Sequence, residues 1–219
     1  MSIHLSQPTV VSTEELQAAQ GFHGHRCPAM PQGLRAGHLA MDILGVSRAR
    51  GGRELIAVVE TGRHHFSGCF VDGVQFATGC TAGKGNLEQE PMGKFAVTLV
   101  DPATHRAVRV ALKSERLLGC LSTEFFRLRA QGVPPWDVEP GLVDPLITEV
   151  LTRPWQELFE VRLFPSYPYD LPQEAFTAVR CADCGEVVVE RYATAFEGSW
   201  LCRPCLDARL HGGNRQPGA

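Results

Sequence analysis

The stretch that decides the fold runs from Cys69 to Asn86 and reads CFVDGVQFATGCTAGKGN. Apolar residues such as Phe70 and Val74 recur at helical spacing, which predicts a helix over about residues 68–78. Gly79 then ends that helix. The glycine-rich end of the stretch allows the backbone to approach a ligand closely or to adopt positive φ.

A second informative stretch lies upstream, where Gly21–Pro28 reads GFHGHRCP. His23, His25 and Cys27 stand at alternate positions, so they would share one face of an extended segment. Pro28 suits the first position of a helix, which would place Cys27 at or near a helix N-terminus. Free backbone N–H groups lower the pKa of a thiol there and favour the thiolate. A locally packed, histidine-rich turn is the alternative interpretation.

The two stretches together predict a core metal site with mixed nitrogen and sulfur ligands. The candidate ligands are His23, His25, Cys27, Cys69 and Cys80. Only some of them can bind at once, because a catalytic zinc uses three protein ligands and a water.

Two further residues are candidates for catalytic roles. Asp72 is expected to orient a ligand histidine or to act as a base, and Lys84 is expected to balance an anionic substrate. The alternative for Asp72 and its helical neighbour Gln75 is that both are polar residues of a helix surface.

The C-terminal region contains two Cys-x-x-Cys pairs separated by seventeen residues: Cys181, Cys184, Cys202 and Cys205. This spacing predicts a four-thiolate zinc site, which is closed and therefore structural. The residues between the pairs are typical of a β-hairpin, and a helix is expected after the last cysteine. From Ala178 onward the five arginines and five acidic residues balance, so contact with protein is favoured over contact with nucleic acid.

The remaining patterns predict both helices and strands. Helices are expected from Ser12 or Thr13 to about Gln20, and over residues 32–44, 114–132 and 142–151. Strands are expected at 54–60, and a hairpin at 94–100 and 106–112. Because helices and strands do not alternate strictly, the predicted fold class is α+β, a mixed helix and antiparallel-sheet core followed by a small zinc-finger domain.

Domain boundaries follow from composition. We expect a core domain over residues 1–165, a proline-rich linker over 166–177, a four-cysteine zinc finger over 178–212 and a disordered tail over 213–219.

The composition excludes several classes of protein. The 219 residues carry 21 basic and 24 acidic side chains, with no apolar run long enough to span a bilayer. No secretory signal is recognised, so a cytoplasmic location is expected and the eight cysteines are expected to serve as metal ligands or reactive thiols rather than as disulfides.

The motifs FHGHRCP and CFVDGVQFATGCTAGKGNL resemble those of the FmdE-like family, which is named after formylmethanofuran dehydrogenase. The C-terminal cysteines resemble the treble-clef zinc finger of some members. Ala29 departs from the family pattern, which has glycine there. The resemblance implies a core site of His23, His25, Cys27, Cys69 and Cys80, with zinc as the usual metal. It also implies an α+β core that forms intertwined homodimers and an association with a larger oxidoreductase complex.

The resulting hypothesis is a zinc-binding protein that acts as an accessory subunit or as an enzyme in C1 or molybdopterin-type redox metabolism. No iron–sulfur, flavin or dinucleotide motif is recognised. The competing hypothesis is a metal- or redox-sensing regulator whose finger contacts protein or nucleic acid. A solvent-open ion in a cleft would favour the first, and a closed core site the second.

Overall fold

The computed structural model describes residues 10–62, 65–171 and 176–211. The chain divides into two compact units, Met1–Asp170 and Leu171–Ala219. Residues 172–175 of the expected linker and all of the expected tail lie outside the described residues.

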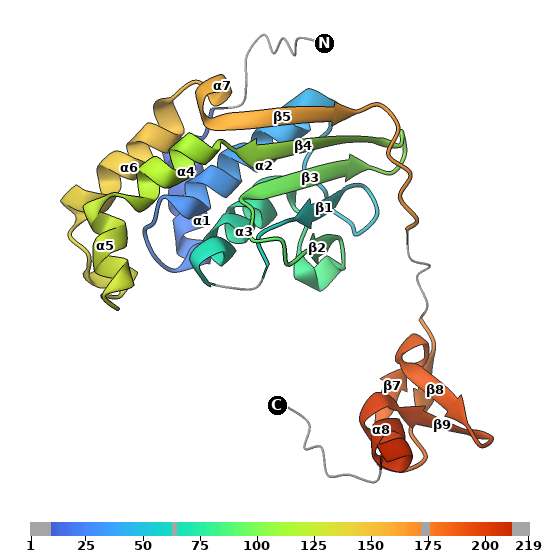
Figure 1. Ribbon diagram of the computed structural model, residues 1–219. Coiled ribbons are helices and arrows are strands. Elements are labelled where there is room, and N and C mark those ends of the chain that lie inside the picture. The colour runs from blue at the N-terminus through green and yellow to red at the C-terminus, as the bar shows by residue number, and fades with distance from the viewer. Residues whose placement is uncertain (1–9, 63–64, 172–175, 212–219) are drawn as a thin grey trace. The chain divides into compact units, whose positions relative to one another are not determined.

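The first unit combines helices with one sheet (Figure 1). Its helices are α1 (Thr13–His23), α2 (Ala29–Leu44), α3 (His65–Thr78), η1 (Ala82–Lys84), α4 (Ser114–Leu121), α5 (Glu124–Ala130), η2 (Pro135–Asp137), α6 (Pro140–Thr152) and α7 (Trp155–Leu158). Its strands are β1 (Ile56–Val59), β2 (Leu87–Gln89), β3 (Ala96–Asp101), β4 (Arg106–Leu112) and β5 (Phe159–Phe164).

The five strands form one sheet in the order β2-β1-β3-β4-β5. The predicted hairpin is β3–β4, which pairs antiparallel with Leu99 opposite Val108. β5 extends the sheet antiparallel to β4, whereas β1 and β2 run parallel, so the sheet is mixed. The predicted α+β class is confirmed.

Three elements differ from the expectation. The helix expected over 114–132 is two helices, α4 and α5, because the Ser122 and Thr123 hydroxyls donate to the carbonyls of Gly119 and Cys120 where α4 ends. β2 and β5 were not expected. β2 has three residues, and β5 is an edge strand with a weak alternating pattern.

The core lies between one face of the sheet and the helices. Alternate residues of β3 and β4, such as Val97, Leu99, Val108 and Val110, are fully buried in it. α2 supplies most of the facing surface, because nearly every residue from Ala29 to Leu44 is buried on one side or another. Figure 1 shows α4 to α7 gathered at one end of the strands.

The α2–α3 crossing depends on two glycines. A Cβ atom at Gly33 would lie 1.9 Å from the Phe70 carbonyl oxygen, and one at Gly73 would lie 2.0 Å from the Met30 carbonyl oxygen. No side chain fits in that space, so the two helix backbones touch directly. The crossing therefore fixes where the N-terminal ends of both helices lie.

The second unit is built from two small hairpins and one helix. Its elements are β6 (Ala178–Arg180), β7 (Val187–Val189), η3 (Glu190–Tyr192), β8 (Ala193–Phe196), β9 (Ser199–Cys202) and α8 (Arg203–His211). β6 pairs with β7 and β8 with β9, both antiparallel. The predicted turn glycine, Gly185, has φ +76°.

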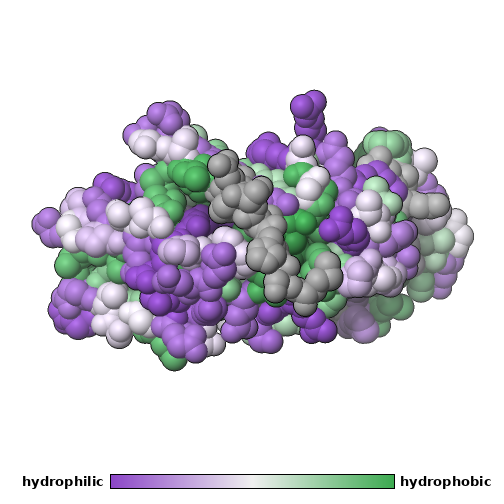
Figure 2. Space-filling model, turned by 90° about the horizontal axis from the view of Figure 1, so that it is seen from above, coloured by the Kyte–Doolittle hydropathy of each residue, from purple (hydrophilic) through white to green (hydrophobic). Residues whose placement is uncertain are grey.

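The surface is mostly polar. On the face seen in Figure 2, hydrophilic residues dominate and apolar residues form small groups between them. Within the described ranges, no helix has both the length and the apolar character that crossing a bilayer requires.

One ion pair crosses the sheet and gives a test of the fold. The Arg109 guanidinium donates to both carboxylate oxygens of Glu60, at 2.6 and 2.7 Å, and holds the pKa of Glu60 below its usual value against the effect of burial. Glu60→Gln is expected to lower the free energy of unfolding by about 2 kcal/mol at pH 7, because it leaves a half-buried guanidinium unneutralised.

Because the folded pKa of Glu60 is depressed, the contribution of this pair should fade as the pH falls from about 4.5, the unfolded value, through the folded pKa. Urea titrations of both proteins measure the difference. Glu124→Gln is the control, since Glu124 forms an exposed pair with Arg127 and little change is expected. Equal stability of wild type and Glu60→Gln would contradict the assignment.

Candidate metal centres and pocket

Four side chains of the first unit converge on one point: His23, His25, Cys27 and Cys69. Their ligand atoms all lie within 4.8 Å of one another. His23 Nε2 lies 3.2 Å from His25 Nε2 and 3.5 Å from Cys27 Sγ, and Cys69 Sγ lies 3.8 Å from His25 Nε2.

These separations match the edges of a zinc tetrahedron. Ordinary zinc–ligand bond lengths give edges of about 3.3 Å between two nitrogens and about 3.6 Å between nitrogen and sulfur. The donor set of two imidazoles and two thiols also suits zinc. The four residues therefore form a candidate metal site.

The fold brings the four residues together from three elements. His23 is the last residue of α1, and Gly24 at φ +93° turns the chain so that His25 and then Cys27 face back towards it. Cys27 lies just before α2, and Cys69 lies one turn into α3. The expected extended segment is wrong at His23, which is helical, but the turn produces the same convergence.

A carboxylate supports the site from behind. Asp72 Oδ2 accepts a hydrogen bond of 2.7 Å from His23 Nδ1, which leaves Nε2 facing Cys27 and His25. Gln75 Nε2 donates to Asp72 Oδ1, and Gln75 Oε1 accepts from the Ala82 N–H. Asp72 thus makes the contact that fixes ring orientation in many metal sites.

The thiol and the imidazole are electrostatically matched. A hydrogen bond from Cys69 lowers the pKa of Cys27 well below its usual value despite burial, with further help from His23, His25 and the Met30 N–H. Burial lowers the pKa of His23, but Asp72 and Cys27 outweigh it and raise that pKa to about 9. The helix N-terminus expected at Cys27 thus contributes to a thiolate, the form that binds metals.

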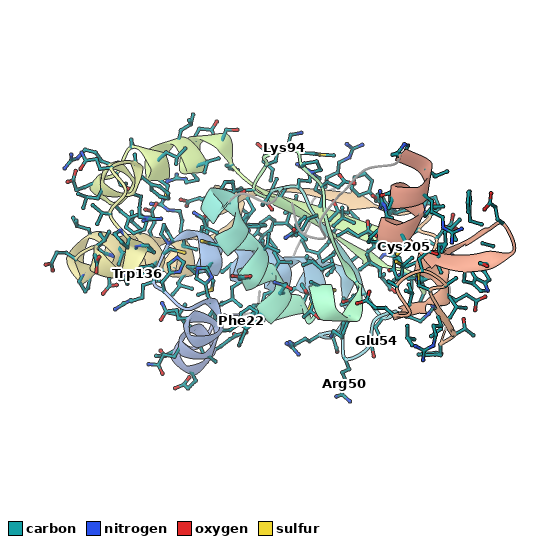
Figure 3. All side chains as sticks on the ribbon, turned by 90° about the horizontal axis from the view of Figure 1, so that it is seen from below. Phe22, Arg50, Glu54, Lys94, Trp136 and Cys205 are labelled. Carbon is teal, nitrogen blue, oxygen red and sulfur yellow. The ribbon has the colours of Figure 1, made fainter. Side chains whose placement is uncertain are left out.

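Two of the sequence candidates lie elsewhere. The structure does not bring Cys80 into the cluster. Its fully buried thiol donates to the Leu55 carbonyl oxygen at 3.5 Å, and burial raises its pKa to about 11. Lys84 Nζ donates to the carbonyls of Ala49 and Arg50. These contacts hold the loop before β1, where Arg50 and Glu54 lie near each other (Figure 3), so they assign Lys84 to the fold rather than to the cluster.

A cleft of about 400 Å³ borders the cluster. Three of the four clustered residues line it: His25, Cys27 and Cys69. The rest of its wall is mostly apolar and comes from the start of α2, the end of α4, α5 and the start of η2. Sequence reasoning missed this cleft, because its far wall lies over fifty residues from either motif.

The second unit holds the other candidate metal site: Cys181, Cys184, Cys202 and Cys205. Cys184 Sγ and Cys202 Sγ lie 3.8 Å apart, the edge of about 3.8 Å that a four-sulfur zinc tetrahedron requires. The backbone N–H groups of Cys202 and Cys184 lower the pKa of Cys181 to about 6. None of the eight cysteines forms a disulfide. The cluster is consistent with a zinc finger.

The Asp72 contact gives a direct test of the core cluster. Asp72→Asn is expected to weaken zinc binding there by about 10- to 100-fold, because the neutral amide no longer holds the His23 ring. Competition with a chelator of known affinity measures the change. Asp137→Asn, an exposed change in η2, is the control. Unchanged affinity in Asp72→Asn would refute a supporting role.

Comparison with known proteins locates the chain in a family. Residues 22–160 match the family model described as "FmdE, Molybdenum formylmethanofuran dehydrogenase operon". The chain is 36% identical over 126 residues to a "Probable S-adenosyl-L-methionine-binding protein" of Archaeoglobus fulgidus; these residues are 56% of this chain and 33% of that protein. The chain thus spans about a third of the length of this curated relative.

A solved structure is similar over nearly the whole chain. The crystal structure of an FmdE-like protein from Syntrophus aciditrophicus, described as related to tungsten formylmethanofuran dehydrogenase, aligns with a TM-score of 0.57 and 25% identity. The alignment covers 97% of this chain and 100% of that one. The family model includes both motifs and all four residues of the core cluster, and on this evidence the chain belongs to the FmdE family.

Proposed function

We propose that the chain is a zinc-dependent protein of C1 or molybdopterin-type redox metabolism, acting there as an accessory subunit or as an enzyme. His23, His25, Cys27 and Cys69 would hold a zinc ion in the core, and the four C-terminal cysteines a structural one. The observation that carries this proposal is the cleft, because three of the four core ligands line it. A purely structural zinc is normally enclosed.

The chain's own residues have defined tasks at this site. Asp72 accepts the Nδ1 proton of His23 and fixes the ring, and the Met30 N–H helps to keep Cys27 as a thiolate. The apolar wall of the cleft excludes water, which strengthens electrostatic interactions inside it. A bound zinc would supply Lewis acidity towards a carbonyl or a water molecule.

Contacts in the finger support binding to protein rather than to nucleic acid. Arg209 is bonded to Asp183 and lies 3.8 Å from Glu197, so its charge is already neutralised. In the core unit, Phe22, Leu118 and Trp136 are large exposed apolar residues. We propose that such residues contribute to a homodimer in the cytoplasm and to contact with a larger oxidoreductase complex. Light scattering of the purified protein would test the dimer.

The role of the core ion can be tested with cobalt. The full chain loaded with Co²⁺ should show thiolate-to-cobalt absorption that Cys69→Ser alters and Cys80→Ser leaves unchanged. Added small thiols or cyanide should change the spectrum of the wild-type core site, because an ion beside the cleft is accessible.

The regulator hypothesis makes the opposite forecast. A spectrum that is insensitive to added ligands, together with loss of metal and a change in oligomeric state on peroxide treatment, would replace the proposed function with a redox sensor.

A further inference from the structure

The cleft beside the core cluster has a chemistry of its own. Its lining consists of His25, Cys27, Pro28, Ala29, Cys69, Leu121, Phe125, Phe126, Arg129, Ala130 and Pro135. None of these residues is acidic, and one permanent charge, that of Arg129, stands in the wall. The volume of about 400 Å³ lies within the range for small-molecule sites.

The charge of Arg129 is not neutralised by the protein within the described ranges. Its guanidinium donates to the Val133 carbonyl, which anchors the side chain at the end of α5, but no carboxylate pairs with it there. Its neighbour on the same helix, Arg127, forms an ion pair with Glu124. A guanidinium in an apolar wall without a counter-charge is suited to a carboxylate, which it can bind through two parallel hydrogen bonds.

The aromatic side chains define the other part of the ligand. Phe125 and Phe126 lie edge to face, with ring centroids 5.1 Å apart, and both line the cleft. Leu121 and Pro135 extend the apolar surface on their side, and Pro28 and Ala29 come from the start of α2. Such walls favour a flat apolar body, since burial of apolar area stabilises the complex.

We propose that this cleft binds a small carboxylic acid with an apolar or aromatic body. Its carboxylate pairs with Arg129, its body lies against Phe125 and Phe126, and it faces the cluster of His25, Cys27 and Cys69. The site rests on the proposed function only in that a core ion forms one wall, so the two can fail separately.

Paired ligands test the proposal on the full, zinc-loaded chain. Calorimetry should show that 3-phenylpropanoate binds about tenfold or more tightly than 3-phenylpropanamide, because the charge-assisted contact to Arg129 is lost in the amide. Arg129→Gln should abolish this preference and Arg129→Lys should retain part of it. Arg127→Gln, two residues away and outside the cleft, should behave as wild type.

Two controls keep the outcomes distinct. Melting curves show whether each variant folds, and the comparison of acid with amide in the wild type needs no variant. Zinc content is measured on the same samples. Preference for the acid without a core zinc would support the cleft and reject the proposed function. Equal binding of acid and amide, no binding of either, or an unchanged preference in a folded Arg129→Gln would overturn the cleft assignment.

Discussion

Replacing Cys184 with serine is expected to remove one of the two bound ions and to unfold the C-terminal unit while the first unit stays folded. The buried hydrophobic cluster of that unit consists of Cys181, Leu201 and Cys202, so two of its three members are themselves metal ligands. Structural zinc supplies apparent binding energies of about 10 kcal/mol or more to such units. Without it, little apolar burial remains to offset chain entropy.

Limited proteolysis with mass spectrometry, together with metal analysis, measures both effects. New cleavages should appear between residues 178 and 211 and the first unit should resist. Cys120→Ser is the matched control, because Cys120 belongs to neither cluster. A folded C-terminal unit in Cys184→Ser would contradict the assignment of its zinc as structural.

Gly73→Ala is expected to damage both the fold and the core site. The added methyl group would lie 2.0 Å from the Met30 carbonyl oxygen and 2.5 Å from the Leu34 nitrogen, so α2 and α3 must move apart. Overpacking of this kind costs about 3 kcal/mol. Cys27 precedes one of these helices and Cys69 lies on the other, while metal bonds tolerate shifts of only about 0.2 Å.

The variant should therefore bind core zinc more than about tenfold more weakly and keep the zinc of the C-terminal unit. Gly68→Ala is the matched control on the same helix, because nothing lies within 4 Å of a Cβ atom there. Chemical denaturation and chelator competition measure the two effects. Equal behaviour of the two variants would show that the crossing does not position the cluster.

The sequence predicted the ligands better than their surroundings. The Cys-x-x-Cys spacing alone located the finger ligands, because a short loop brings two thiolates together regardless of the rest of the fold. The pairing of His23, His25 and Cys27 with Cys69 also followed from the two motifs. Cys80 did not, because the direction of its side chain is set after Gly79, at φ +71°, where helical periodicity no longer applies.

The residues that sequence reasoning missed depend on tertiary contacts. Lys84 resembles a substrate-binding lysine in its glycine-rich setting, yet its ammonium group caps carbonyls of the loop before β1. Arg129 belongs to no motif and becomes notable only because the break at Ser122 and Thr123 starts a new helix that turns it towards the cleft.

X-ray absorption at the zinc edge of the purified full chain tests the central claim most directly. With two ions per chain, one held by four sulfurs and the other by two nitrogens and two sulfurs, the average zinc should have three sulfur neighbours at about 2.3 Å and one nitrogen at about 2.0–2.1 Å. One ion per chain with four sulfur neighbours would contradict the account, because the imidazoles and thiols of the core would then hold no metal.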